Sequence, residues 1–483
     1  MKVTLVNPPY TLWRPETEYV SRLLGPMPPL GLVCLATYVR SRMPALDIEI
    51  VDATARGLSA EQAAQRVIES RPQVLGLTIT TAAEPAARTV ATQVKAALPG
   101  VTVIVGGPHV SALGENVLGR SIAFDVGVIG EGERTFHELL EALGAGRPVQ
   151  RIPGIVFRDP AENGRIVRTA AREPIEDLDS LPPPAWELLD GFPARYAANV
   201  FFSPGGPAAS LTTSRGCPYG CLFCDQSTFG RRWRGASAEH VFAAVRGLQE
   251  LHGIRYLIFS DDTFTLSRGR VLDFCRLVRD LERPLAWSCD ANVNNLDREM
   301  LGVMRQAGCW SISFGLESGS PRVLESLGKN ITLDRAARVV RETRAAGIHA
   351  KGLFMLGAPE ESAETVRQTR QFIRSLPLST INISKFTPYP GSQLSRLVAD
   401  QCPEDYGRLN GMNFVVPSKH LSIPELEREY DLTIRSFFST LRAVRTHAPI
   451  LLGRRENLWR LLGALPAALA ARFHQGRRGP EES

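Results

Sequence analysis

Short apolar runs alternate with amphipathic stretches over the first third of the chain. Five runs of mostly branched apolar residues occupy 3–6, 48–51, 74–79, 101–105 and 124–128. The segments between them, at 30–42, 60–69, 82–98 and 134–143, have the length and spacing of helices. Near-continuous apolar strands separated by helices predict a doubly wound parallel sheet with helices on both faces. We therefore expect a Rossmann-like α/β domain over residues 1–145.

A second alternating series begins near residue 206 and ends near residue 400. Its apolar runs lie at 210–214, 256–259, 285–289, 310–314, 350–355 and 380–386. Helical patterns such as 238–251 and 333–346 follow these runs. The series predicts a partial (β/α)6 barrel of the TIM type over 206–400, with its functional residues at the carboxyl ends of the strands.

The segments outside the two series are shorter or irregular. Residues 152–157 and 166–169 flank a turn-prone stretch and predict a β-hairpin. The stretch 181–186 is too proline-rich for a helix, so we interpret residues 146–205 as a hairpin followed by an ordered connector. Beyond residue 400 the alternation stops, and residues 401–483 predict a helical C-terminal region.

Polar and glycine-rich stretches follow the strands of the first series, at 7–9, 78–81, 106–109 and 130–133. Parallel α/β sheets bind ligands at the carboxyl ends of their strands, so these loops form the expected binding edge. No Gly-x-Gly-x-x-Gly follows the first strand and no Walker-type loop occurs. A dinucleotide or a nucleoside triphosphate is therefore disfavoured as the ligand.

Composition narrows the class of protein. The 483 residues are 44% hydrophobic and 22% charged, as in soluble globular proteins, and a net charge of +6 is too mild to indicate nucleic acid binding. We find no apolar run long enough for a membrane span and no signal-peptide pattern. Eight cysteines without an export signal favour the reducing cytoplasm. The basic stretch 454–462 predicts a helical cap over the barrel or, alternatively, a peripheral membrane contact.

Three cysteines lie within eight residues: Cys217, Cys221 and Cys224. Thiolates are soft ligands that select zinc, copper(I) or iron–sulfur clusters, and Gly216 and Gly220 favour a loop that curls around one centre. A closed zinc site takes four ligands, usually as two short pairs, whereas only three cluster here. Three thiolates on a four-iron cluster leave one iron open, which points to chemistry beyond electron transfer.

The spacing Cys-x-x-x-Cys-x-x-Cys, with Phe223 before the last cysteine, resembles the signature of the radical S-adenosylmethionine (SAM) superfamily. The resemblance implies a 4Fe-4S cluster on the three cysteines and SAM chelating the open iron. In that family an electron from the cluster cleaves SAM to methionine and a 5′-deoxyadenosyl radical. The resemblance also implies a small-molecule substrate and an external electron donor such as flavodoxin or ferredoxin.

Loops after later strands of the second series resemble further motifs of the superfamily. The SAM contacts that this resemblance implies are Ser260, Asp261, Asp262, Ser288, Asn292, Glu317 and Gly357. The acidic loop 260–262 would accept hydrogen bonds from the amino group of SAM. The loops that contain Ser288 with Asn292 and Glu317 would hold its ribose or its amino acid end, and Gly357 would lie near the adenine. For each residue alone, a structural role is an equal alternative.

The loops of the first series resemble those of the N-terminal cobalamin-binding domain in one large radical SAM subclass. The residues implied to lie along the corrin or its nucleotide tail are Thr78, Thr80, Gly106, Gly107, His109, Gly130 and Glu131. The Asp-x-His-x-x-Gly motif that supplies a lower axial histidine is absent, as is common in that subclass, which fits cobalt without a histidine ligand. A packing role for His109 is the favoured alternative.

Together the two series resemble a cobalamin-dependent radical SAM enzyme of the class B methyltransferase type. The resemblance implies methylation of an unactivated carbon in a small natural-product or lipid-like substrate, with methylcobalamin as the methyl donor to a substrate radical. The same cofactors could instead serve cyclisation, rearrangement or dehydration. A non-catalytic, cobalamin-binding regulatory protein is the alternative outside enzymes.

Overall fold

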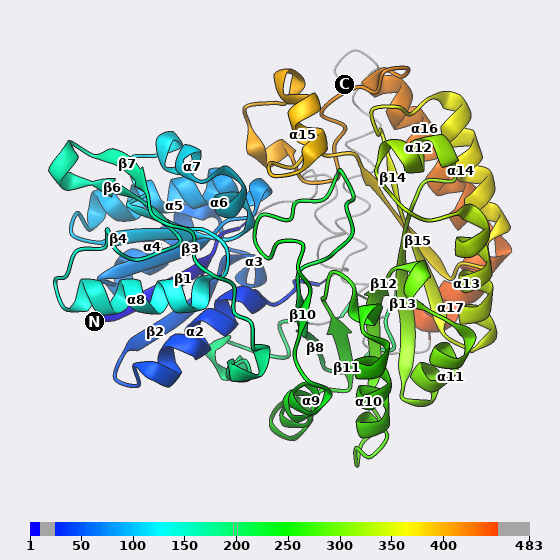
Figure 1. The fold of residues 1–483 in the computed structure, drawn as a ribbon, viewed down its shortest axis with the longest axis horizontal. Helices are drawn as coiled ribbons and strands as arrows, with labels where there is room; N and C mark the ends of the chain where they lie inside the picture. Colours follow the sequence, from blue (N-terminus) through cyan, green and yellow to red (C-terminus); the bar gives the residue numbers. More distant parts are fainter. Residues whose placement is uncertain (10–24, 197, 200, 453–483) are drawn as a thin grey trace.

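The structure is a computed structural model that describes residues 1–9, 25–196, 198–199 and 201–452. Its two large sheets, one from each alternating series, lie side by side (Figure 1). The stretch 454–462, for which we expected a cap or a membrane contact, lies outside the described residues. Within the described part of the chain, no helix is long and apolar enough to cross a membrane.

The first sheet has the strand order β2-β1-β3-β4-β5-β6-β7. Its strands are β1 (Lys2–Asn7), β2 (Asp47–Asp52), β3 (Val74–Thr78), β4 (Thr102–Gly106), β5 (Val126–Val128), β6 (Ile155–Asp159) and β7 (Arg165–Arg168). The strands β1 to β5 are parallel, as their continuous apolar runs predict. We expected the hairpin β6–β7 in the connector, but β6 pairs antiparallel with β5, so the first sheet extends to Arg168.

Helices cover both faces of the first sheet. Side chains of α2 (Leu30–Arg42) and α8 (Gly132–Gly144) pack on one face, and those of α4 (Ala60–Ser70) and α5 (Glu84–Ala97) on the other. The short helices α3 (Ala53–Arg56) and α6 (Pro108–Leu113) follow the ends of β2 and β4, and α7 (Glu115–Arg120) comes directly after α6. The expected doubly wound arrangement is confirmed.

The second sheet has six parallel strands in the order β15-β14-β13-β12-β11-β8. They are β8 (Ala208–Leu211), β11 (Tyr256–Phe259), β12 (Ala286–Ala291), β13 (Cys309–Glu317), β14 (His349–Leu356) and β15 (Thr380–Lys385). Among the described strands the edges β8 and β15 do not pair with each other, so the barrel is open. This is the partial barrel that the sequence predicts.

Helices surround the barrel, as Figure 1 shows. They are α9 (Ala238–His252), α10 (Arg268–Val278), α11 (Arg298–Gln306), α12 (Pro321–Ser326), α13 (Leu333–Ala345) and α14 (Ala363–Ser375). Two short strands, β9 (Ser214–Arg215) and β10 (Arg234–Gly235), pair antiparallel on either side of the cysteine loop. The three cysteines therefore follow the first barrel strand, as expected.

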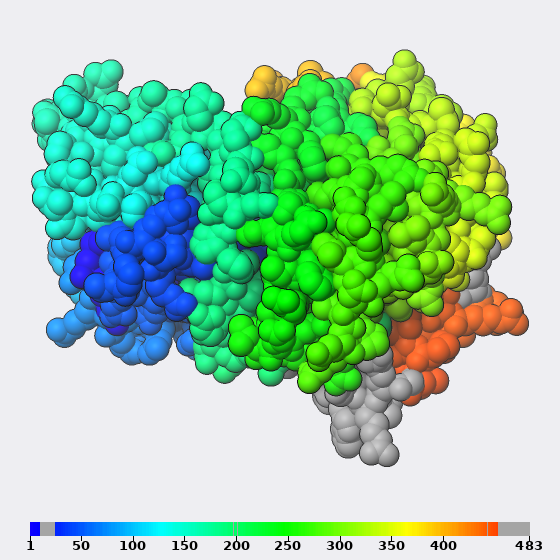
Figure 2. Space-filling view, turned by 60° about the horizontal axis from the view of Figure 1, so that its bottom comes forward, coloured from blue at the N-terminus to red at the C-terminus, as the bar shows by residue number. Residues whose placement is uncertain are grey.

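The described residues of the connector pack between the two units. Ile175, Trp186 and Tyr196 are at most 3% exposed, and they belong to one apolar cluster with α2, α8 and the barrel strands. Figure 2 shows the connector filling the seam between the two units. The described part of the connector thus lies along the seam between the two units.

The C-terminal region adds α15 (Gln393–Leu397), α16 (Ile423–Phe438) and α17 (Leu441–Leu452). Its short helix η9 (Tyr406–Arg408) packs against η2 (Thr81–Ala83) and α5 of the first unit. Its helix α16 packs against α14 of the barrel, so the C-terminal region touches both units.

Candidate active site

The cysteine loop is held by its own backbone and one side chain. Gly216 has a φ of +82°, and a Cβ there would lie 2.3 Å from the carbonyl oxygen of Arg232, so this turn requires glycine. Gln226 Nε2 donates hydrogen bonds of 2.9 Å to the carbonyl oxygens of Cys217 and Tyr219. The turn at Gly216 and the two hydrogen bonds from Gln226 therefore constrain the conformation of the loop.

Asp261 fixes the chain that leads into this loop. Its fully buried carboxylate accepts hydrogen bonds from the Thr213 hydroxyl at 2.6 Å and from the Ser214 amide at 3.1 Å. Arg270 Nη2 lies 3.3 Å from the same carboxylate and compensates its charge. With these partners Asp261 acts as a clamp, and it does not line the cavity that the cysteines face.

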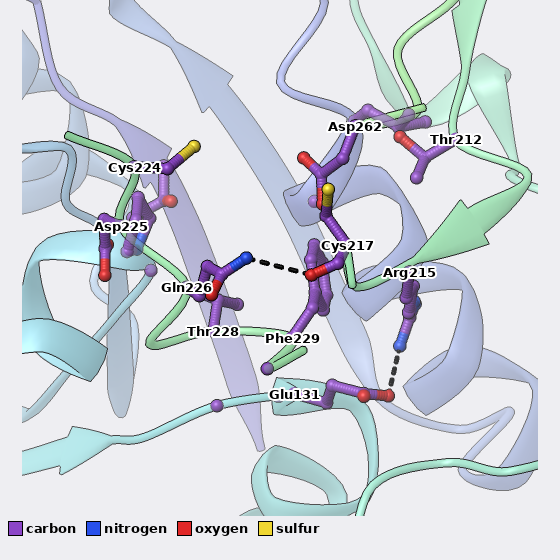
Figure 3. Close-up of a pocket in the computed structure, with 18 of the residues that line it drawn as sticks. Glu131, Thr212, Arg215, Cys217, Cys224, Asp225, Gln226, Thr228, Phe229 and Asp262 are labelled. Carbon is purple, nitrogen blue, oxygen red and sulfur yellow. Dashed lines mark hydrogen bonds and ion pairs between the residues drawn. The ribbon is translucent and has the colours of Figure 1, made fainter. Parts of the chain in front are cut away.

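A cavity of about 630 Å³ lies between the carboxyl ends of the two sets of strands (Figure 3). Most of the site residues expected from the sequence line it: Thr78, Gly106, Gly107, Gly130, Glu131, Cys217, Cys221, Phe223, Cys224, Asp262, Asn292 and Glu317. Because both units contribute, the two ligand sites that the sequence predicts open into one space.

The other expected contacts lie outside this lining: Thr80, His109, Ser260, Asp261, Ser288 and Gly357. Ser288 is buried inside the barrel, with its Oγ 2.9 Å from the hydroxyl of Tyr256. Gly357 has a φ of +92° and lies against the ring of Phe414. These contacts are those of the structural alternative, and the SAM contacts expected of Ser288 and Gly357 stay predictions.

His109 packs between the first sheet and the C-terminal region. Its Nδ1 is 3.2 Å from Thr81 Oγ1, and its ring centroid is 4.7 Å from that of Tyr406. Burial, with a smaller contribution from Arg120, lowers the pKa of His109 to about 4, so the imidazole is neutral at physiological pH. This is the packing role favoured for it, and no histidine occurs among the described residues that line the cavity.

The three thiols suit a shared iron–sulfur cluster. Figure 3 shows Cys217 and Cys224 on the loop beside the cavity. Burial raises the pKa of the Cys221 thiol, and burial together with the charge of Cys221 raises that of Cys224 to about 12. Iron must therefore displace protons that the free thiols hold. Among the described residues, no three His, Cys, Asp or Glu side chains converge on a position for a single ion. Three thiols on one wall match a cluster, in which each cysteine binds a different iron.

Glu317 and Lys329 form a charged pair in the barrel wall of the cavity. Lys329 Nζ lies 2.9 Å from Glu317 Oε1, and both side chains are nearly buried. Glu317 has a φ of +59°, a conformation that costs a non-glycine residue roughly 1–3 kcal/mol. Burial lowers the pKa of Lys329, but the attraction of Glu317 and Cys221 outweighs it and raises the pKa overall. The sequence does not single out Lys329, because a single lysine after a short helix belongs to no motif.

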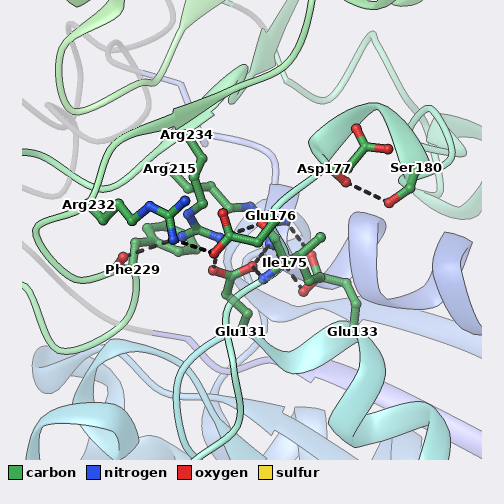
Figure 4. Close-up of polar contacts among 10 residues, drawn as sticks. All are labelled: Glu131, Glu133, Ile175, Glu176, Asp177, Ser180, Arg215, Phe229, Arg232 and Arg234. Atoms are coloured by element: carbon green, nitrogen blue, oxygen red, sulfur yellow. Dashed lines mark hydrogen bonds and ion pairs between the residues drawn. The ribbon is translucent and has the colours of Figure 1, made fainter.

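A second set of charged residues joins the two units beside the cysteine loop (Figure 4). Glu131 Oε2 lies 2.6 Å from Arg215 Nη1, and its Oε1 lies 2.6 Å from Arg234 Nη1. Arg215, two residues before Cys217, also pairs with Glu133. Burial lowers the pKa of Arg215, but Glu133 and Glu131 outweigh it and raise the pKa. Glu131, which we expected along the corrin, thus anchors the first unit to the cysteine loop.

Glycines form the opposite wall of the cavity. Gly106 ends β4, and Gly107 has a φ of +106° with no room for a Cβ, which would lie 2.9 Å from the carbonyl oxygen of Ile79. Gly130 has a φ of +77°, and Thr78 ends β3 at the same edge. A wall with few side chains lets a broad, flat ligand approach the backbone. These residues fit the corrin of cobalamin.

Family models match the two units separately. Residues 211–373 match the radical SAM superfamily, and residues 18–140 match the B12 binding domain. The first match covers the cysteine loop and most barrel strands, and the second covers the strand-end glycines of the first sheet. The two matched segments therefore face each other across the cavity.

Similar proteins and a similar solved structure also combine these features. The chain is 36% identical over 396 residues to the "Uncharacterized methyltransferase PH0819" of Pyrococcus horikoshii, a match that covers 82% of each chain. It is 27% identical over 422 residues to the anaerobic magnesium-protoporphyrin IX monomethyl ester cyclase of Rubrivivax gelatinosus, covering 86% of this chain and 73% of that one. Its fold matches the radical SAM methyltransferase TsrM of Kitasatospora setae, solved with cobalamin and a 4Fe-4S cluster bound, with a TM-score of 0.69 at 19% identity, over 99% of this chain and 100% of that one. The chain thus belongs to the radical SAM superfamily, to the group with a B12-binding domain, and it is an enzyme whose cofactors are a 4Fe-4S cluster, SAM and cobalamin.

Proposed function

We propose that the enzyme is a methyltransferase that passes a methyl group from SAM, through cobalamin, to an unactivated carbon of a small molecule. The observation that carries the proposal is the single cavity lined by both the cysteine loop and the strand-end glycines of the first sheet. The name of the Pyrococcus horikoshii relative supports methyl transfer as the outcome.

Different residues of the chain would bind SAM and cobalamin. When bound, the cluster supplies the electron that cleaves SAM, and cobalamin carries the methyl group. Lys329 would receive the carboxylate of SAM, and Asp262 would accept a hydrogen bond from its amino group. Gly106 and Gly107 would leave room for the corrin on the opposite side. The substrate would then lie between the two cofactors, in a space that excludes bulk water.

The partners follow from this chemistry. The cluster needs an external electron donor, such as flavodoxin or ferredoxin, for each cleavage of SAM. All eight cysteines of the chain are free in the structure, and we infer that the enzyme works in the reducing cytoplasm, where thiols stay available for iron.

Labelled SAM tests the proposal directly. The enzyme is reconstituted anaerobically with iron, sulfide and hydroxocobalamin, reduced, and supplied with methyl-deuterated SAM and candidate extracts. We expect methionine, 5′-deoxyadenosine and a product that carries the labelled methyl group, all of which disappear in Cys221→Ala. In contrast, Cys275→Ala, at a buried cysteine of α10 outside the cavity lining, should retain iron and SAM cleavage.

Ring formation is the second candidate, because the Rubrivivax gelatinosus relative is named a cyclase. Cyclisation would consume SAM and form 5′-deoxyadenosine without placing any label in the product. A product with changed mass but no deuterium would therefore replace methyl transfer by cyclisation, rearrangement or dehydration.

A further inference from the structure

A row of polar side chains crosses the inner face of the barrel beneath the cavity. Asp290 of β12 pairs in register with Ser313 of β13, which pairs in register with Lys351 of β14. Paired residues on neighbouring strands point to the same face of a sheet, and side chains two positions apart share that face. The residues two positions further along these strands line the cavity: Asn292, Gly315 and Leu353. The row therefore points into the barrel.

This polar row is accessible from the interior. Asp290 is exposed and itself lines the cavity, and Lys351 is half-buried. The residues directly before them, Cys289 and Ala350, point outward towards the helices and are 2% and 0% exposed. Along β14 the buried Ala350 and Gly352 alternate with the half-buried Lys351 and Leu353, so Lys351 lies on the same inner face as Leu353, which lines the cavity.

The two charges of the row are not satisfied by each other. Asp290 and Lys351 attract each other electrostatically, yet no direct ion pair joins the two among the described residues. Burial raises the pKa of Asp290 and lowers that of Lys351. Asp261 and Glu317, by comparison, each have an ion-pair partner. Two opposite charges on the inner face of the barrel, without an ion-pair partner among the described residues and with Asp290 in the cavity lining, make this row a candidate ligand site.

We propose that this row binds the substrate, and that the substrate is a small polar molecule whose anionic group is received by Lys351 and whose hydrogen-bond donor is accepted by Asp290. This inference rests on the proposed function and narrows it, because a purely lipid-like substrate offers no partner for the row. A carboxylate and a phosphate share the required chemistry, and the two are separated by experiment.

Chemical protection of Lys351 tests the site without a known substrate. The reconstituted enzyme, with cluster and cobalamin, is treated with succinimidyl acetate, and the acetylation rate of each lysine is followed by peptide mass spectrometry. Sodium phosphate or sodium acetate should slow the acetylation of Lys351 severalfold. The rate at the exposed Lys419 should not change. Asp290→Asn removes the competing carboxylate and should strengthen the protection by either anion.

Each outcome decides. Protection by one or both anions supports an anion site at Lys351; protection by acetate alone assigns a carboxylate, and protection by phosphate alone assigns a phosphate. Equal rates at Lys351 with and without both anions overturn the inference. Iron and corrinoid content, measured on the same samples, show that Asp290→Asn has folded and loaded its cofactors. Reductive cleavage of SAM to 5′-deoxyadenosine is measured separately. Its absence from the wild type would remove the proposed function while leaving the protection result readable.

Discussion

The two walls of the cavity are built in different ways. The barrel wall depends on buried charges: Glu317 with Lys329 in the lining itself, and Asp261 with Arg270 holding the chain that leads into the cysteine loop. The first-sheet wall depends on backbone geometry at glycines such as Gly107. A buried charge is lost by deleting a side chain, whereas a glycine wall is disturbed by adding one. Deletions should therefore damage the barrel wall, and additions should damage the sheet wall.

The largest effect is expected from Asp261→Ala, because it leaves Arg270 as a buried charge without its partner. Breaking such a pair costs about 3–5 kcal/mol. We expect the free energy of unfolding in urea to fall by that amount, and the reconstituted protein to bind less iron. Asp273→Ala, on the exposed side of α10, is the matched control and should stay within about 0.5 kcal/mol of the wild type. Full iron content with unchanged stability would show that the carboxylate is not the clamp.

The next effect concerns the contact of the first sheet with the C-terminal region. The pKa of His109 is about 4 in the folded protein, below its ordinary value of 6.5. Above pH 6.5 the imidazole is neutral in both states. Between pH 6.5 and 4 the unfolded chain binds a proton that the folded chain does not, so stability falls as the pH falls.

In His109→Gln the loss of stability between pH 6.5 and 4 that comes from the imidazole should disappear. Over that pH range the wild type should lose up to about 3 kcal/mol more stability than the variant, as measured by urea unfolding at a series of pH values. Parallel curves for the two proteins would mean that His109 titrates alike in the folded and unfolded chains.

An added methyl group tests the sheet wall. In Gly107→Ala the Cβ would lie 2.9 Å from the carbonyl oxygen of Ile79, at a φ that alanine disfavours. The expected cost is roughly 1–3 kcal/mol, with reduced retention of hydroxocobalamin on gel filtration and unchanged iron content. Gly119→Ala, where a Cβ meets nothing within 4 Å, should retain the corrinoid. Equal retention in both variants would contradict a glycine wall for cobalamin.

The smallest effect is expected from Gln226→Ala. This change removes the two hydrogen bonds to the carbonyl oxygens of Cys217 and Tyr219, each worth about 1 kcal/mol. The cluster should still assemble, but its absorbance should bleach faster in air than that of the wild type. Gln65→Ala, on an exposed part of α4, is the control. A bleaching rate equal to that of the control would show that the loop does not need this side chain.

Local sequence patterns were sufficient to predict the cysteine loop and the glycines of the first-sheet wall. The spacing of the three cysteines and the glycines after β4 and β5 are contained in short stretches, and the structure brings them to one cavity. The alternation of apolar runs also predicted both sheets, because buried parallel strands need helices on their faces.

Long-range pairing could not be predicted from the same patterns. Asp261 and Asp262 are neighbours in sequence, but one clamps Thr213 and the other lines the cavity, and only the structure assigns the two roles. The ion pairs of Arg215 with Glu131 and Glu133 join residues more than 80 positions apart. The hairpin was placed in the connector for the same reason, since its strand partner β5 lies outside it.

The apolar cluster that runs from α2 and α8 through Trp186 into the barrel has a consequence for folding and inheritance. Since the two units share this interior, neither can unfold without exposing apolar surface of the other, and the pair should melt in a single cooperative transition. A recombination event that exchanged one unit alone would leave a mismatched core. The two units are therefore expected to descend together, as one evolutionary module.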